Sequence, residues 1–366
     1  MATGGPRPGR TMMRTLVVLG VLVLTGIVVA LARPASPGGD PVEPAWVDTL
    51  PEPAATSDMQ EGIAVGLFFE EEGGTWESYL WEAARTGATH VSIVARLAMH
   101  DVRATEVRSS PGMTPSDDEL RDAIRHAHAL GLEVLFFPIV WLEHRETGEW
   151  RGRIVTNDLD AWFDSYRDHL VHWAQIADEE GVALFSVGSE LGSLERHTDR
   201  WLAVIDAVRA EFDGELMYSA NWDHYHRTTF WDAVDYIGVT GYYELAPRDG
   251  DIPGVDGLVE AWAPVEASLA AVAERHDRPV VITEIGYVSQ TDAARYPWNY
   301  TLTGDVDLRA QRDLYEAMFR ALDGEPWLGG VYVWNWFGDG GVDDDGYTPR
   351  GKPAEHVVRH WFGGPP

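Results

Sequence analysis

Short apolar runs alternate with amphipathic segments along the chain from Gly62 onward. Such runs are typical of buried parallel strands, and the segments between them have the spacing of helices. The predicted strands cover residues 62–69, 90–96, 132–138, 182–187, 216–220, 236–240, 280–283 and 330–333. The predicted helices cover residues 76–85, 116–131, 160–180, 258–276, 308–322 and 354–361, with one more ending at residue 212. Eight strands alternating with helices over roughly 300 residues predict an α/β fold, the (β/α)8 TIM barrel.

Local signals support two of these helices. Ser116 stands three residues before Glu119, which is the spacing of a capping box, and Gly131 follows as a helix-ending glycine. In the segment 160–180 the aromatic residues recur at helical spacing, so we interpret them as packing residues rather than ligand contacts.

An open doubly wound sheet is the alternative to a barrel. That fold usually carries a glycine-rich phosphate-binding turn after its first strand. Here the turn is Glu70-Glu71-Glu72-Gly73-Gly74, which is acidic and would repel phosphate. A barrel is therefore favoured, and in a barrel the active site lies at the carboxyl ends of the strands.

Two predicted strands end in a glutamate. Glu284 follows the apolar run 280–283, and Glu190 follows 182–187 after a short Gly-Ser step. A charge at the end of a buried run is costly unless it is paired or in use. Each alone fits a solvated or salt-bridged carboxylate, but two of the same design suggest acid/base and nucleophilic work on a glycosidic bond.

At these positions the chain resembles the large clan of retaining glycoside hydrolases with a barrel fold, and most closely glycoside hydrolase family 113, the β-mannanases. The matching stretches are TPSDDELRDAI, EWRGRI, FSVGSEL, YSANWD, FWDAVDYIGVTGYY, VVITEIGY, the Pro-Trp at 297–298, VYVWNW and GYTPRGKPAE. The resemblance implies that Glu190 is the acid/base and Glu284 the nucleophile. A retaining pair of carboxylates sits roughly 5–5.5 Å apart.

The resemblance also implies substrate-binding residues on the same rim. Tyr242 is expected to hold Glu284 in position, and Trp334 to form the floor under the sugar at the cleavage point. Asn221 and Trp222 follow the fifth predicted strand and are expected to touch substrate. For each of these residues, plain packing at the rim is the alternative.

Two positions depart from the pattern. Many relatives in the clan have an asparagine before the acid/base, where it bonds the sugar 2-hydroxyl; here that residue is Ser189. The third predicted strand is followed by Trp141 where a basic or polar residue is usual, and we expect Trp141 to contribute a neighbouring sugar subsite.

Composition excludes several classes of function. The chain has 28 Lys and Arg against 59 Asp and Glu residues, a formal net charge of −31, which argues against a nucleic-acid partner. It has no cysteine, so disulfides, a thiolate nucleophile and a Cys-ligated metal are excluded. His224 and His226 lack a third ligand nearby, and Asp343-Asp344-Asp345 lacks the spacing of a calcium loop. We expect no metal and no cofactor.

The first residues predict export. Residues 1–14 are a basic flank with Arg7, Arg10 and Arg14, and residues 15–32 are uncharged and apolar. This is a transmembrane anchor or a signal peptide, and its length favours the anchor slightly. Residues 33–57 form a Pro-rich linker, and residues 58–366 form the (β/α)8 glycoside hydrolase domain. We expect an extracytoplasmic protein, anchored by one helix or secreted if the segment is cleaved.

The function predicted from these observations is retaining hydrolysis of β-1,4-mannosidic bonds in mannan or glucomannan. The partner is then a polysaccharide or oligosaccharide, and we expect a monomer. One alternative keeps the chemistry but acts on another β-glycan or on short manno-oligosaccharides. Another is a non-catalytic barrel that binds glycan, against which the presence of both carboxylates argues.

Overall fold

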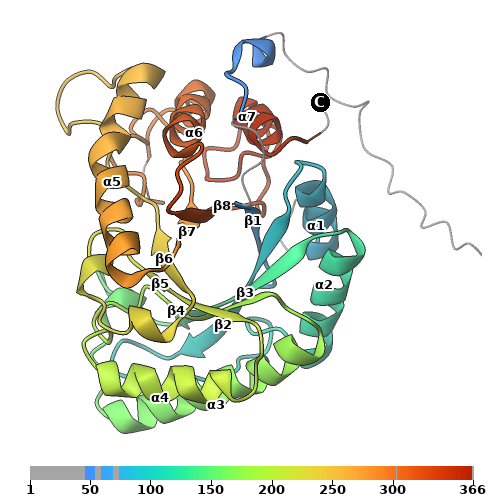
Figure 1. The fold of residues 1–366 in the computed structure, drawn as a ribbon, viewed down its shortest axis with the longest axis vertical. Coiled ribbons are helices and arrows are strands. Elements are labelled where there is room, and N and C mark those ends of the chain that lie inside the picture. Colours follow the sequence, from blue (N-terminus) through green and yellow to red (C-terminus); the bar gives the residue numbers. More distant parts are fainter. Residues whose placement is uncertain (1–45, 54–58, 69–73, 302, 365–366) are drawn as a thin grey trace, which may run out of the picture. The chain divides into compact units, whose positions relative to one another are not determined.

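The computed structural model describes residues 46–53, 59–68, 74–301 and 303–364 (Figure 1). Eight parallel strands pair in chain order, and the first also pairs with the last, so the sheet closes into a barrel. The strands are β1 Gln60–Gly66, β2 His90–Met99, β3 Glu133–Leu142, β4 Leu184–Ser189, β5 Glu215–Ala220, β6 Tyr236–Thr240, β7 Val280–Ile285 and β8 Leu328–Val333. The predicted TIM barrel is confirmed.

Helices surround the sheet on its outer side (Figure 1). They are α1 Trp76–Ala84, α2 Asp117–Ala129, α3 Leu159–Glu179, α4 Thr198–Arg209, α5 Val255–His276, α6 Leu308–Leu322 and α7 Pro353–Trp361. The connection from β5 to β6 holds two 3-10 turns, Tyr225–Arg227 and Trp231–Ala233, in place of a helix. Two further 3-10 turns are Val47–Thr49 and Arg151–Arg153. Every other connection carries the helix that the barrel pattern requires.

The local signals act as predicted. The hydroxyl of Ser116 accepts from the Glu119 amide at 3.3 Å, while the Glu119 carboxylate accepts from the Ser116 amide at 2.8 Å. Gly131 has a φ of +81°, a left-handed conformation that glycine adopts without strain. The aromatic residues of α3 are buried against the sheet, as expected of packing residues.

Several strand ends differ from the prediction. β2 and β3 stay paired as far as Met99 and Leu142, so Trp141 lies inside β3 rather than after it. The proline at 138 does not end β3, because it lies beyond the two residues of β3 that pair with β4, where a missing N–H is tolerated. Glu284 likewise lies inside β7, which runs to Ile285.

The inside of the barrel is filled by side chains from alternate strand positions. Its cluster includes Val94, Leu135, Met217 and Tyr332. A Cβ on Gly62 would come within 2.1 Å of the Tyr332 ring, so only glycine fits on β1 at that level. The barrel is thus closed by packed side chains below the level of the strand ends, where the polar residues gather.

The predicted N-terminal segments 1–14 and 15–32 lie outside the described residues and stay predictions. Among the helices that the structure does describe, none combines the length and the apolar character needed to cross a bilayer.

The end of the predicted linker belongs to the barrel domain. Val47 and Leu50 are buried in the main hydrophobic cluster, and the Trp46 ring packs edge-on against His356 of α7. The His360 ring bonds the carbonyl oxygen of Pro51 at 2.9 Å. The predicted start of the domain, residue 58, therefore excludes residues that pack on the barrel. Their few apolar side chains lie among prolines and show no periodic pattern.

Candidate active site

Two buried carboxylates meet at the carboxyl end of the barrel. Glu190 directly follows β4 and Glu284 lies near the end of β7. One nitrogen, Nη2 of Arg151, is 2.8 Å from Glu190 Oε2 and 3.8 Å from Glu284 Oε1. The two oxygens are therefore at most about 6.6 Å apart, the sum of these distances, which suits the roughly 5–5.5 Å of a retaining pair. The separation of an inverting pair, roughly 6.5–9.5 Å, lies almost wholly above this bound.

The backbone around Glu190 is unusual. A register shift between β4 and β5 at Ser186 and Ser189 marks a bulge, and Glu190 itself has a φ of +55°. That left-handed conformation costs a residue other than glycine about 1 kcal/mol. It is held by the Glu190 amide, which donates to the Ser219 carbonyl at 2.8 Å, and by Thr240, whose hydroxyl donates to Glu190 Oε1 at 2.9 Å. The strain aims the carboxylate at the centre of the site.

Glu284 receives two hydroxyl donors. Tyr242 donates to Oε2 at 3.2 Å, which is the contact expected of it, and Ser189 donates to Oε1 at 3.4 Å. Burial and the neighbouring carboxylate raise the pKa of Tyr242 well above its usual range, so its phenol keeps the proton that it donates. Both donors favour the ionised form of Glu284.

The pair nevertheless holds on to a proton. Burial and the charge of Glu190 raise the pKa of Glu284 to about 8, against the opposing effects of Arg151, Tyr242 and Ser189. Two like charges this close do not both ionise readily, so near neutral pH the pair carries one acid and one carboxylate. Without substrate, Arg151 Nη2 faces Glu190 Oε2 at 2.8 Å and lies farther from Glu284 Oε1, at 3.8 Å.

Trp334 and Gly286 pack closely at the rim. Trp334 follows β8 and its half-buried ring lies edge-on to Phe337, with centroids 5.5 Å apart. A Cβ on Gly286 would lie 2.0 Å from the Trp334 carbonyl oxygen, so the glycine is required by this close approach. The position of Trp334 is thus fixed by the strand that carries Glu284.

The residues after β5 lie on the same rim. The half-buried ring of Trp222 contacts Tyr243, with centroids 5.8 Å apart. The side-chain oxygen of Asn221 is buried without a hydrogen-bond partner in the described part of the chain. An unpaired buried acceptor in a polar site is suited to a ligand hydroxyl.

Trp141 differs from the other predicted site residues. Its ring lies 4.0 Å from the guanidinium carbon of Arg96 and 5.0 Å from that of Arg145. No contact joins it to either carboxylate within the described ranges. The guanidinium of Arg96 therefore stacks closely on the Trp141 ring. A sugar bound at Trp141 would need that same ring face.

Sequence reasoning missed Arg151 and Thr240 as contacts of the carboxylates. Arg151 lies in the stretch EWRGRI, which carries part of the family resemblance, but an arginine in a loop is usually a surface residue. Only the fold shows that the 3-10 turn Arg151–Arg153, after β3, brings one of its two arginines to Glu190.

The geometry agrees with comparisons against known proteins. The sequence profile of Glycoside Hydrolase Family 113 matches residues 70–349. The β-mannanase of this family from Alicyclobacillus acidocaldarius, solved in complex with ManMIm, is 31% identical with a TM-score of 0.74, over 83% of this chain and 97% of its own. The chain belongs to glycoside hydrolase family 113.

Other comparisons add less to the family 113 assignment. A second family 113 structure, a β-1,4-mannanase in a complex, is 27% identical with a TM-score of 0.71, over 84% of this chain and 99% of that one. A β-glucuronidase from Faecalibacterium prausnitzii, at 17% identity, a TM-score of 0.59 and coverage of 84% of this chain and 49% of its own, shares the fold alone. No curated protein sequence matches significantly.

Other polar groups of this family 113 barrel have structural partners. Lys352, the only lysine, is buried and donates to Asp344 at 2.7 Å, Ser289 at 2.8 Å and the Gly346 carbonyl at 3.1 Å. Its ammonium therefore sits where a cation would be held by the acidic turn 343–345. His224 lies 3.6 Å from the buried Glu195, and His226 is exposed. Within the described ranges, no group of three or more His, Asp or Glu residues is placed to hold a metal.

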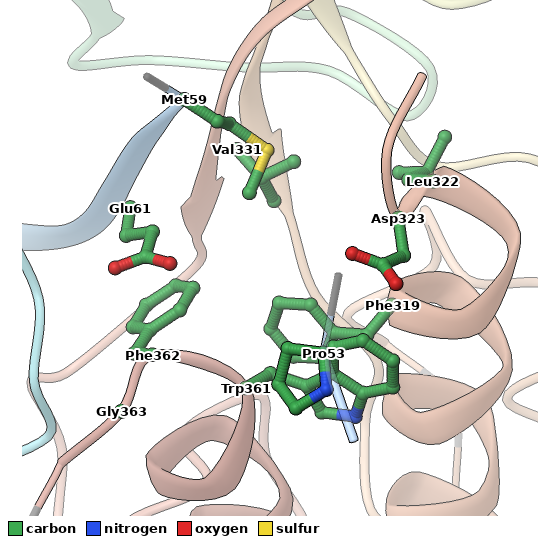
Figure 2. A pocket seen from close by; sticks show the side chains of 10 residues that line it. All are labelled: Pro53, Met59, Glu61, Phe319, Leu322, Asp323, Val331, Trp361, Phe362 and Gly363. Carbon is green, nitrogen blue, oxygen red and sulfur yellow. The ribbon is translucent and has the colours of Figure 1, made fainter. Parts of the chain in front are cut away.

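A separate pocket of about 240 Å³ lies at the other end of the barrel (Figure 2). It is lined by Glu61 at the start of β1, by Asp323 after α6, and by Trp361 and Phe362 at the end of α7. Burial raises the pKa of Glu61 to about 7. Because it faces the amino ends of the strands, this pocket is not part of the carboxylate site.

Proposed function

We propose that this chain is a retaining β-mannanase that cleaves β-1,4-mannosidic bonds by double displacement. The observation that carries the proposal is the pair Glu190 and Glu284, held within about 6.6 Å by contacts to one arginine nitrogen. Glu284 attacks the anomeric carbon while Glu190 gives its proton to the departing glycosidic oxygen. Glu190 then takes a proton from water, which attacks the same carbon and releases Glu284. Two inversions leave the anomeric configuration unchanged.

The proton must lie on Glu190 when this reaction starts. Tyr242 and Ser189 both donate to Glu284 and stabilise its negative charge. When a glycosidic oxygen approaches Glu190, it offers the proton an acceptor and displaces part of the Arg151 contact. Substrate binding thus moves the shared proton to the acid, as the mechanism requires.

The substrate is proposed to be mannan or glucomannan. Support comes from family 113 membership and from relatives whose names identify them as β-mannanases. Trp334 would stack on the sugar at the cleavage point, and Trp222 on a neighbouring one. The test is a panel of β-glycans with products sized over time and the first-formed anomer observed by NMR. We expect β product from mannan; an initial α product, or faster cleavage of cellulose or xylan, would overturn the proposal.

The catalytic roles are tested by Glu284→Gln and Glu190→Gln. Each variant should lose at least about 1,000-fold in turnover while still binding manno-oligosaccharide, because the shape of the site is kept. A matched control is Glu274→Gln, an exposed residue on α5. Near-native turnover by Glu284→Gln would show that the nucleophile is another residue. Near-native turnover by Glu190→Gln would likewise refute its role as the acid/base.

One observation favours short manno-oligosaccharides as a second candidate substrate. Arg145, after β3, donates to the exposed Tyr300 hydroxyl, after β7, at 3.1 Å. These strands lie on opposite sides of the closed barrel, so the bond spans the end at which the carboxylates lie. A hydrogen bond between these two loops would hinder the binding of a long polysaccharide across the site. Tyr300→Phe should raise activity on polymer relative to mannotetraose; an unchanged ratio would refute the restriction.

We also propose that the protein works outside the cytoplasm, anchored by residues 15–32. The basic flank before this apolar stretch supports that orientation. Fractionation of cells that express the full chain tests it. Full-length protein in the medium rather than in membranes would exclude the anchor.

A further inference from the structure

The guanidinium of Arg151 keeps donor capacity that its protein partners do not use. Its Nη2 atom faces Glu190 Oε2 at 2.8 Å and Glu284 Oε1 at 3.8 Å. Its Nε atom is buried and has no hydrogen-bond partner among the residues described. A buried unpaired donor costs free energy, so an arginine in this state is expected to have a further partner during function.

The gap between Arg151 and Glu284 fits a hydroxyl group. At 3.8 Å, the Nη2 and Oε1 atoms are too far apart for a good hydrogen bond. A hydroxyl oxygen placed between the two atoms could lie about 2.8 Å from each, which is a normal hydrogen-bond distance to both. It would accept from the guanidinium and donate to the carboxylate, so both protein atoms would gain a partner.

The chemistry of the reaction identifies this hydroxyl. Glu284 attacks the anomeric carbon, and the 2-hydroxyl is on the adjacent carbon, next to the attacking carboxylate. Hydrogen bonds to this hydroxyl strengthen in the transition state of glycoside hydrolysis. Ser189 is also close, but its single O–H is already directed at Glu284 Oε1, at 3.4 Å. The donor left for the sugar is therefore the guanidinium.

We infer that Arg151 binds the 2-hydroxyl of the sugar at the cleavage point and so helps to select that sugar. The inference rests on the proposed function, since it assumes that Glu284 is the nucleophile. Arg151 then has two tasks in sequence. In the free enzyme it pairs with Glu190, and in the complex it turns its donors to the substrate, which leaves Glu190 able to hold the proton.

The experiment compares two substrates in several variants. The substrates are an aryl β-mannobioside and its counterpart that lacks the 2-hydroxyl on the sugar bonded to the aryl group. Arg151→Met removes charge and donors, whereas Arg151→Lys keeps the charge without the planar fork. Arg153→Met is the matched control, because Arg153 stands on the same 3-10 turn, is exposed, and donates to the Gly148 carbonyl at 3.2 Å.

The measured quantity is the ratio of kcat/KM for the two substrates. We expect the wild-type protein and Arg153→Met to prefer the complete substrate by about 100-fold. Arg151→Met and Arg151→Lys should reduce that preference below about 5-fold. Any effect of the substitution on the carboxylates is common to both substrates and cancels in the ratio.

A preference that stays near about 100-fold in both Arg151 variants would overturn the inference and leave Arg151 a partner of the carboxylates alone. If Arg151→Met fails to fold, the ratio for Arg151→Lys decides. The proposed function fails separately, if the wild-type protein cleaves aryl β-glucobioside but not the mannobioside. In that event the same comparison, made with the 2-deoxy glucoside, still tests Arg151.

Discussion

Replacing Glu284 by glutamine should stabilise the fold, by an amount that grows with pH. The pKa of Glu284 rises in the folded protein from 4.5 to about 8, chiefly through burial and then through the charge of Glu190. A carboxyl group that binds its proton more tightly when folded contributes full stability below pH 4.5. That contribution is lost as the pH rises through 8. Glutamine does not titrate, so the variant escapes the loss.

The size of the effect follows from the shift. One pKa unit corresponds to about 1.4 kcal/mol, and Glu284 is 3% exposed, so solvent screens the interaction little. Between pH 5 and pH 8 the advantage of Glu284→Gln over the wild type should grow by about 3 kcal/mol. For a domain of this size that corresponds to roughly 5 °C in the unfolding midpoint.

The assay is thermal unfolding of both proteins at intervals between pH 5 and pH 8. Groups away from the site that titrate in this range, such as Glu61 with a pKa of about 7, contribute equally to both proteins and cancel in the difference. Glu274→Gln should follow the wild-type curve at every pH. A difference between Glu284→Gln and wild type that does not change with pH would refute the reasoning.

Three further perturbations follow from packing. Lys352→Met removes the cationic partner of Asp344 and leaves its carboxylate with backbone amide donors, so it should cost about 2–4 kcal/mol in denaturant unfolding. Adding Asp344→Asn should recover much of that cost, and simple additivity of the two substitutions would contradict the pairing. Removing residues 1–45 should leave a stable domain. Removing residues 1–57 also deletes the buried Val47 and Leu50 and should lower the free energy of unfolding by about 2–4 kcal/mol. Equal melting midpoints for the two truncated proteins would disprove this. Gly286→Ala should displace Trp334 and so lower kcat/KM at least about 10-fold. A native kcat/KM would show that the backbone at the rim accommodates the added methyl group without moving the Trp334 ring.

The order of strands was predictable because a parallel barrel buries its strands on both faces. Each strand then stands out as an apolar run, and strands that follow one another in the chain are neighbours in the closed sheet. The lengths were less predictable. β2 continues past residue 96 because Leu97, Ala98 and Met99 still pair with β3, but a polar residue at 96 resembles a strand end. Pattern alone does not show where pairing stops.

The carboxylates were predictable for the same reason that the strands were. An acid at the end of an apolar run contrasts with its neighbours, and Glu190 and Glu284 both have this contrast. Arg151 does not, because it lies in a polar loop 39 residues before Glu190, on a turn that only the folded chain brings over the site. Residues that act from loops depend on long-range geometry that no local pattern records.

The two carboxylates of the site repel each other, and contacts from neighbouring residues hold them in place. Glu190 occupies a left-handed conformation and stands close to a second buried carboxylate, and both features cost free energy. The adjacent strands offset that cost: β5 accepts from the Glu190 amide, and Thr240 at the end of β6 donates to its carboxylate. Arg151 supplies the missing positive charge, but from a loop, where it is able to leave when a sugar arrives. A fixed cation on a strand would have stabilised the pair more, but it could not have moved away from Glu190 when the glycosidic oxygen binds there.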